Sequence, residues 1–130
     1  MVRLTTEPAE HLHLLSLLIR DRLQESLATP AGQKRADKLK GTVGLAAGGM
    51  ESRMRFERGR VHLDQGPLRE ASVKGSGTLA AFLAVCQGKM KATQLLRGRL
   101  RVSGNPLLLA RALPLLQAEA GDDDLEDAQP

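Results

Sequence analysis

The chain has 130 residues, a length typical of one domain that buries its own core without disulfide or metal cross-links. Hydrophobic residues make up 42% and charged residues 26%, and no apolar run approaches the roughly 18 residues that a membrane-spanning helix requires. The formal net charge is +4, but aromatic residues make up only 2%, which argues against a nucleic-acid binder that stacks bases on aromatic rings.

The first predicted element is a helix over residues 8–28, with Thr6 as its N-cap. Its apolar face repeats at helical spacing and comprises Leu12, Leu15, Ile19 and Leu23, widened by Leu14 and Leu18. The Thr29-Pro30-Ala31-Gly32 segment ends this helix, and residues 33–40 are either a short basic helix or a mobile link. This N-terminal helical segment is expected to span residues 1–40.

The hydrophobic period then changes to that of strands. Residues 42–47 predict a weak strand, and residues 50–57 alternate cleanly, with Met50, Ser52, Met54 and Phe56 on one face. Residues 60–64 and 69–75 continue the pattern, with turns at Gly59 and at Gly66-Pro67. Four strands in close succession favour an antiparallel meander.

Helical spacing returns in the second half. Thr78 can cap a helix that runs to about Gln87, and residues 92–97 predict a shorter one. Residues 99–103 alternate as a strand, and Asn105-Pro106 begins a last helix over residues 107–117, in which Pro114 predicts a kink or an end near Leu113. The partial segregation of strands and helices indicates an α+β fold with helices on one face of the sheet.

The charges are unevenly distributed. Residues 119–130 hold six acidic side chains and no basic one, whereas the body before them is strongly basic. We therefore divide the chain into one domain, residues 1–118, whose sheet and helices occupy 41–118, and an acidic disordered tail, 119–130. The tail either keeps the protein soluble or screens the basic body.

Several of these features together resemble a known family. A helix ending in Gly88-Lys89-Met90 is followed by a short amphipathic stretch, by the run from Gly98 to Asn105, and by a leucine-rich helix. The strand–turn–strand around Gly59 precedes them. In this order the features resemble the type 2 sterol carrier protein domain over residues 40–117.

The resemblance implies a five-stranded, mostly antiparallel sheet, with helices covering one face and an apolar tunnel between the two layers. It also implies non-catalytic binding of a sterol, fatty acid, acyl-CoA, phospholipid or quinone-like lipid, with no cofactor. Combined with the inward positions above, it predicts ten lining residues: Met54, Phe56, Val73, Phe82, Leu83, Cys86, Met90, Leu96, Leu100 and Leu109. Small inward residues and flexible methionines suit an under-filled interior, although an ordinary packed core would have them too.

Basic side chains are expected on the opposite, wet face of the sheet. Arg53, Arg55, Arg99 and Arg101 alternate with the inward residues of their strands, and Lys34, Arg35, Lys38 and Lys40 form a second cluster. They predict docking on an anionic membrane or a partner, or they are simply a solvated surface. Nucleic acid is not expected, because no recognition motif is present.

No motif indicates an enzyme or a metal site. His11 and His13 are two residues apart and cannot share a helix face, and Cys86 has no neighbouring base. Gly75-Ser76-Gly77 lacks the third glycine of a dinucleotide fingerprint. We therefore expect a soluble cytoplasmic lipid carrier, with peripheral membrane attachment as an option. The alternative is a scaffold subunit of a lipid- or quinone-modifying complex, which binds an enzyme or a second copy through the N-terminal helix.

Overall fold

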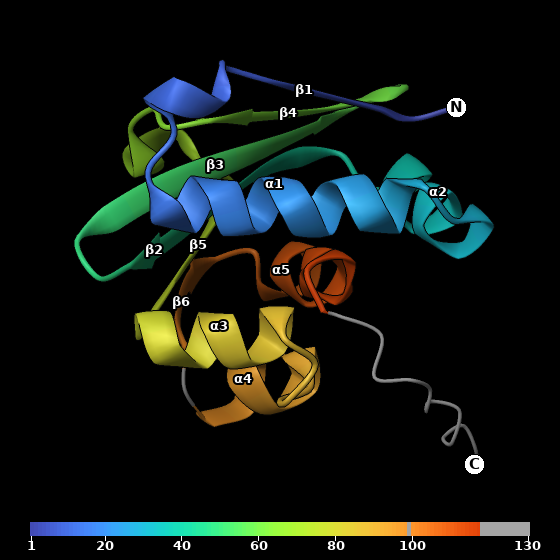
Figure 1. The fold of residues 1–130 in the computed structure, drawn as a ribbon. Helices are drawn as coiled ribbons and strands as arrows, with labels where there is room; N and C mark the ends of the chain where they lie inside the picture. The colour runs from blue at the N-terminus through green and yellow to red at the C-terminus, as the bar shows by residue number, and fades with distance from the viewer. Residues whose placement is uncertain (99, 118–130) are drawn as a thin grey trace, which may run out of the picture.

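The computed structural model describes residues 1–98 and 100–117 and has two layers, a mixed sheet and a set of helices over one of its faces (Figure 1). The strands are β1 (Arg3–Thr6), β2 (Gly41–Ala47), β3 (Met50–Glu57), β4 (Arg60–Asp64), β5 (Val73–Gly77) and β6 (Arg101–Gly104). The α-helices are α1 (Leu14–Leu27), α2 (Pro30–Asp37), α3 (Leu79–Cys86), α4 (Ala92–Gly98) and α5 (Pro106–Ala112). Three 3-10 turns are added: η1 (Ala9–His11), η2 (Leu68–Glu70) and η3 (Leu113–Leu115).

The predicted α+β class is confirmed, but the sheet has six strands rather than five, in the order β1-β4-β3-β2-β5-β6. β2, β3 and β4 form the predicted antiparallel meander. The meander does not continue into β5, because β5 lies beside β2 and parallel to it. The connection through η2 crosses the outer face of the sheet, where Leu68 covers Gly44 so closely that an added Cβ would lie 2.8 Å from its Cδ2.

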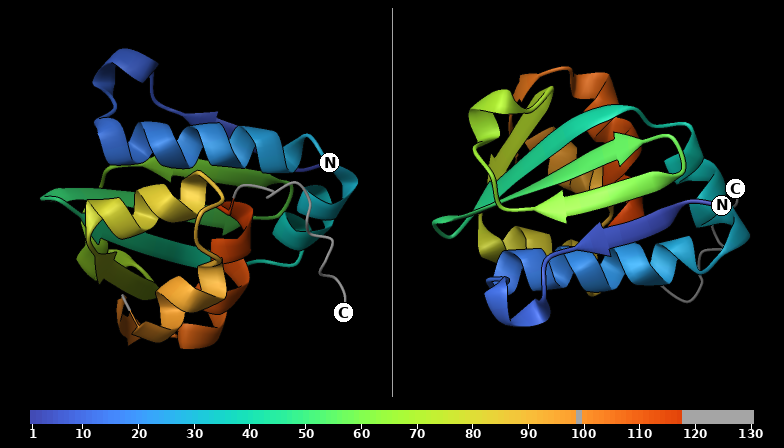
Figure 2. Two further views of the ribbon diagram at one scale, coloured as in Figure 1. Left: turned by 60° about the horizontal axis from the view of Figure 1, so that its bottom comes forward. Right: turned by 90° about the horizontal axis from the view of Figure 1, so that it is seen from above.

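The N-terminus differs most from the prediction. Residues 3–6 form β1, a parallel edge strand beside β4 that the sequence pattern did not reveal (Figure 2). α1 begins at Leu14, not at Pro8, and its N-cap is His13, whose Nδ1 accepts a hydrogen bond from the Ser16 amide at 3.2 Å. Gln65, the residue after β4, fixes the start of α1, since its Oε1 accepts a hydrogen bond from the His13 amide at 3.0 Å. This tertiary contact explains why local capping signals placed the helix start too early.

The caps of the other helices follow the sequence. Thr78 caps α3 by accepting from the Ala81 amide, and Asn105 caps α5, with Pro106 in its first turn. α5 ends at Ala112, and Pro114 lies in the 3-10 turn that follows, as the sequence predicted. The Thr29-Pro30 break starts α2, so the short-helix option for this segment is confirmed, three residues earlier than predicted.

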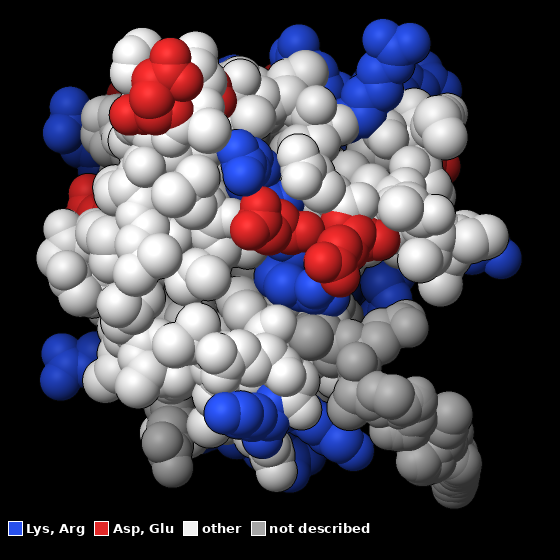
Figure 3. All heavy atoms as spheres, in the orientation of Figure 1, with Lys and Arg blue, Asp and Glu red and all other residues white. Residues whose placement is uncertain are grey.

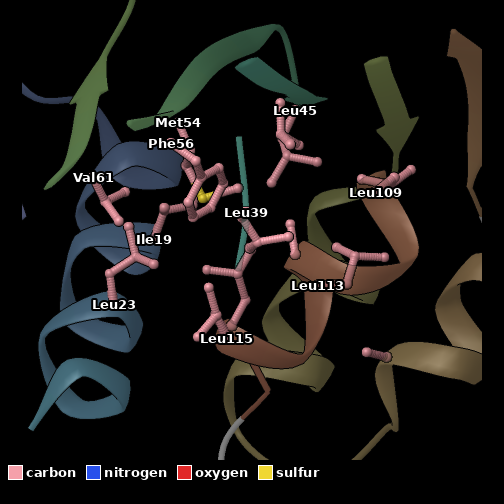
Figure 4. Close-up of a cluster of buried hydrophobic side chains, with 14 of the residues drawn as sticks. Ile19, Leu23, Leu39, Leu45, Met54, Phe56, Val61, Leu109, Leu113 and Leu115 are labelled. Atoms are coloured by element: carbon pink, nitrogen blue, oxygen red, sulfur yellow. The ribbon is translucent and has the colours of Figure 1, made fainter. Parts of the chain in front are cut away.

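The core lies between the inner face of the sheet and the helices. Leu15, Ile19 and Leu23 of α1 are 1% exposed or less, which confirms the centre of the predicted apolar face. Leu14, predicted to widen that face, is 51% exposed, and Leu18 is half-buried. Figure 4 shows side chains from α1, the central strands and α5 meeting in one cluster. The pairing register places Met54 beside Val43 and Phe56 beside Val61 on this inner face.

Candidate apolar ligand site

The inner face of the sheet has a gap in its side chains at β5. Ser52, Leu45, Gly75 and Val102 lie side by side across four strands, so a residue without a side chain stands between two apolar ones. A Cβ built on Gly75 would lie 3.0 Å from Leu100 Cδ2 and 3.2 Å from Leu109 Cδ2. We call the space above Gly75, filled by these two leucines, the Gly75 notch.

The ten predicted lining residues fall into three groups. Met54, Phe56, Val73, Phe82 and Leu109 are buried in the core. Met90, Leu96 and Leu100 are partly buried and pack against that core. Leu83 and Cys86, on α3, are half-buried. The structure therefore brings eight of the ten to one apolar interior, five of them fully enclosed by other side chains.

The apolar interior reaches the surface at one end of the molecule. Leu79 of α3 is another partly buried side chain packed against the core, together with Met90, Leu96 and Leu100. Farther along the chain, Val102 on the inner face of β6 is 38% exposed and Leu107 at the start of α5 is 57% exposed. The helical layer is thus least complete between α3, α4 and the β5–β6 edge.

Gly75 has a role that was not predicted from the sequence, where it stands only in an incomplete dinucleotide fingerprint. The available signal was its position, because a glycine at an inward-facing site of a strand marks a close approach of another group. Ser52 was placed inward correctly, and its hydroxyl makes a buried hydrogen bond to the Ser16 hydroxyl of α1. This pair satisfies the one polar side chain on the inner face of β3.

Cys86 belongs to the half-buried face of α3. Burial raises the pKa of its thiol to about 11, and the positive charge of Arg22 opposes this only in part. The thiol is therefore protonated at neutral pH and is a poor nucleophile. In the part of the chain that the structure describes, no group of three or more His, Cys, Asp or Glu side chains is arranged to hold a metal ion.

A separate pocket of about 170 Å³ lies at the tip of the β2–β3 hairpin. It is lined by residues 46–51 with Ser76 and Gly77, and not by the core leucines. Three of its eight lining residues, Gly48, Gly49 and Gly77, contribute no side chains. It is therefore distinct from the predicted apolar site.

The outer face of the sheet carries Arg53, Arg55 and Arg101, as the register predicts; Arg99 lies outside the described residues. Arg53 is engaged in ion pairs, with Nε 2.7 Å from Asp64 and Nη1 3.0 Å from Glu70, and its side chain is only 14% exposed. Arg55 and Arg101 are more accessible, since the Arg55 side chain is 40% exposed and Arg101 is exposed. The positive charge that this face offers to a membrane or partner is therefore smaller than the four arginines suggest.

Comparison with known proteins identifies the family. The family model for the SCP-2 sterol transfer family matches residues 21–117, about three quarters of the chain. The chain belongs to this family. Its predicted resemblance to sterol carrier proteins is thereby confirmed, and no curated protein sequence matches it significantly.

Solved structures show the same fold at low sequence identity. A structure described as the UbiJ-SCP2 ubiquinone synthesis protein is 19% identical, with a TM-score of 0.61, covering 84% of this chain and 96% of its own. Sterol carrier protein 2 from Yarrowia lipolytica, in its apo form, is 18% identical, with a TM-score of 0.56 and coverage of 79% and 87%. The sterol carrier protein domain 2 of Helicoverpa armigera is 12% identical, with a TM-score of 0.60 and coverage of 86% and 91%.

Family membership implies lipid or sterol binding and transfer as the general function. SCP-2 domains of this kind are generally carriers without catalytic activity, which agrees with the absence of an enzyme motif in the sequence. No helix among the described residues is long and apolar enough to cross a membrane.

Proposed function

We propose that the chain binds and carries one apolar lipid between the inner face of the sheet and helices α3, α4 and α5. The Gly75 notch is the observation that carries this proposal. The atoms nearest to an added Cβ are the ends of Leu100 and Leu109, and leucine side chains can change rotamer without moving the sheet. A lipid chain that replaces Leu100 there lies against Leu109 and near Val73, the preceding inward residue of β5.

The ligand enters, in this proposal, at the end where the apolar interior reaches the surface. Leu79, Met90, Leu96 and Leu100 are already partly exposed, so an apolar ligand meets apolar surface there before α3 and α4 part from the β5–β6 edge. Binding is driven by desolvation, at about 25 cal/mol for each Å² of apolar surface removed from water. Methionines such as Met90 adapt to ligands of different shape, so several lipid classes are accepted.

Native mass spectrometry of the purified protein, with organic extraction of whatever is bound, tests the proposal. We expect a discrete additional mass of a fatty acid, sterol, phospholipid or quinone after incubation with mixed lipids. A protein that keeps its apo mass under these conditions has a permanently filled interior and is not a carrier.

Release at an anionic membrane is part of the same proposal, since Arg55 and Arg101 remain accessible on the outer face. Each basic residue near such a surface contributes about 1 kcal/mol. We expect faster ligand transfer to vesicles rich in anionic lipid, and slower transfer in high salt. Transfer that responds to neither lipid charge nor salt contradicts this part of the proposal.

A scaffold function is the second candidate, and one feature of α1 favours it. Leu14 is 51% exposed and the neighbouring Leu17 and Leu18 are half-buried, so the outer side of this helix keeps an apolar surface. A fold neighbour described as a ubiquinone synthesis protein fits such a role in a lipid- or quinone-modifying complex. The surface would bind an enzyme partner or a second copy.

Gel filtration of a Leu14→Glu variant tests this candidate. An oligomer that dissociates on this substitution supports a contact through α1, whereas a monomer in both proteins removes the support for self-association. Leu15→Glu is not a usable substitute, because Leu15 is 1% exposed and a buried glutamate there unfolds the protein.

A further inference from the structure

The charges of the two halves of the chain are balanced very differently. Residues 1–70 carry twelve basic and nine acidic side chains. Residues 71–117 carry seven basic side chains and no acidic one, and six acids follow within residues 119–127. The unbalanced basic residues are Lys74, Lys89, Lys91, Arg97, Arg99, Arg101 and Arg111.

The ion pairs of the structure follow this division. Every pair between described residues joins side chains of residues 1–70, as in Arg22–Glu25 and Arg60–Glu57. In residues 71–98 and 100–117 each lysine and arginine is exposed, and none makes an ion pair with another described residue. The second half of the fold therefore presents positive charge that the rest of the described chain does not neutralise.

The last described residue lies close to part of this charge. The Gln117 side chain accepts a hydrogen bond from the Ala92 amide at 2.8 Å, and its carbonyl accepts one from Arg22 Nη2 at 3.4 Å. The described chain therefore ends between α1 and the first turn of α4, next to the residue that follows Lys91. Lys89 precedes this point in the chain, and Arg97 lies at the far end of α4.

The two sides of Gln117 differ in charge balance. On α1, Asp21 and Glu25 form ion pairs with Arg20 and Arg22, so the acidic and basic side chains there balance each other. On the α4 side the charged residues are basic. In Figure 3, acidic and basic side chains lie side by side over α1, whereas the charged side chains at the lower end, over α4, are basic.

We propose that the acidic segment 119–127 binds, within the same chain, to the basic end formed by Lys89, Lys91 and Arg97, and competes there with anionic lipid surfaces. Asp127 is ten positions beyond Gln117, and an extended chain covers up to about 35 Å over that length. Single exposed ion pairs are weak, but a tethered partner is present at an effective concentration in the millimolar range. The contact forms at low salt and fades as the ionic strength rises.

The test uses full-length chains in a mutant cycle. One variant neutralises the segment (E119Q, D122N, D123N, D124N, E126Q, D127N), and another neutralises the basic end (K89Q, K91Q, R97Q). A control removes three exposed charges on and just after α2 (K34Q, R35Q, K38Q). Affinity is measured with vesicles containing about 30% phosphatidylserine at low salt.

Neutralising the acidic segment is expected to raise vesicle affinity about tenfold, because basic side chains are released to the surface. This gain is expected to disappear in the chain that lacks the basic end and to persist in the α2 control. Amide NMR shifts between the native and neutralised chains should concentrate at residues 89–97 and be independent of protein concentration.

An equal gain in all three backgrounds reflects net charge alone and overturns the proposal. So do amide shifts that are absent from residues 89–97. Shifts that weaken on dilution assign the contact to a second copy and also overturn it. Lipid extraction is independent of the mutant cycle. If the cycle fails, the carrier proposal still stands, and if no lipid is extracted, the proposed contact of the acidic segment still stands.

Discussion

Gly104 is required by its backbone conformation and also by the space around it. Its φ is +102°, and an added Cβ would lie 2.4 Å from the Ser72 carbonyl oxygen, where the chain leaves β6 against the start of β5. Gly49, in the β2–β3 turn, also has a positive φ, of +80°, but nothing lies within 4 Å of its added Cβ. Substitutions at the two glycines therefore distinguish the cost of backbone strain alone from the cost of strain together with a steric clash.

We expect Gly49→Ala to lower the free energy of unfolding by about 1–2 kcal/mol, the usual cost of holding an alanine at positive φ. Gly104→Ala should cost about 3 kcal/mol or more, because the Ser72 backbone must also move. Urea denaturation of both variants measures the difference. Equal losses would mean that the close approach of Gly104 to the Ser72 backbone adds no cost when a Cβ is introduced.

The Ser16–Ser52 hydrogen bond is the polar contact between α1 and the inner face of β3, and both side chains are 1% exposed or less. Ser16→Ala leaves the Ser52 hydroxyl buried without its partner, at a cost of about 1–3 kcal/mol. The double variant Ser16→Ala, Ser52→Ala should lose less than the sum of the two single variants, because no hydroxyl is then orphaned. Thermal unfolding of the four proteins checks this, and strict additivity contradicts it.

At the scale of elements, the Arg53–Asp64–Glu70 group joins β3, β4 and η2 on the outer face. Burial raises the pKa of Asp64, whereas hydrogen bonds from Arg53 and the Gly66 amide and the charge of Arg53 lower it. The lowering effects are together the larger, so the pKa of Asp64 is below its usual value. A carboxyl with a lowered folded-state pKa stabilises the fold above its unfolded value, near 3.9, and that stabilisation is lost as the pH falls through the folded pKa.

We therefore expect the free energy of unfolding to fall below about pH 4, with part of the loss due to Asp64. Asp64→Asn should reduce stability at pH 7 by about 1–2 kcal/mol and make its acid dependence less steep. Glu70→Gln is the control, because the Glu70 side chain is 60% exposed and its ion pair contributes little. An Asp64→Asn protein with the acid dependence of the native chain would contradict the assignment.

Elements whose signals are local could be predicted, and those that depend on distant residues could not. Thr78, Asn105 and Pro114 act within one or two turns, and the helix boundaries they predict agree with the structure. β1 pairs with a strand almost sixty residues away, so its four residues carry no period that identifies it. The same holds for β5, whose parallel place beside β2 depends on where η2 crosses the sheet.

At the scale of the whole molecule, the site depends on the gap between two layers, which no single strand or helix encodes. Alternation placed Met54, Phe56 and Val73 on the inner face correctly. It could not show that Met54 and Val73 are completely enclosed while Met90, Leu96 and Leu100 remain partly exposed. That division follows from how far α3 and α4 extend over the sheet. Because of it, we propose that the ligand lies near β5 and not over the central strands.

The ligand capacity of this gap is expected to depend on Gly75. Its φ lies outside the positive region, so a strand-forming residue fits the backbone, and the atoms nearest to an added Cβ are the ends of Leu100 and Leu109. We expect Gly75→Val to fold but to fill the Gly75 notch, and to lower the bound lipid fraction in native mass spectra about tenfold, as about 1.4 kcal/mol of lost binding would. Ser76→Val, at the next residue, replaces a small polar side chain by a larger apolar one on the outer face and should leave lipid binding unchanged. Because both substitutions place valine in the same strand, a loss of stability common to both does not affect the comparison of their lipid occupancies. Equal lipid occupancy in the two variants would place the ligand elsewhere than above β5.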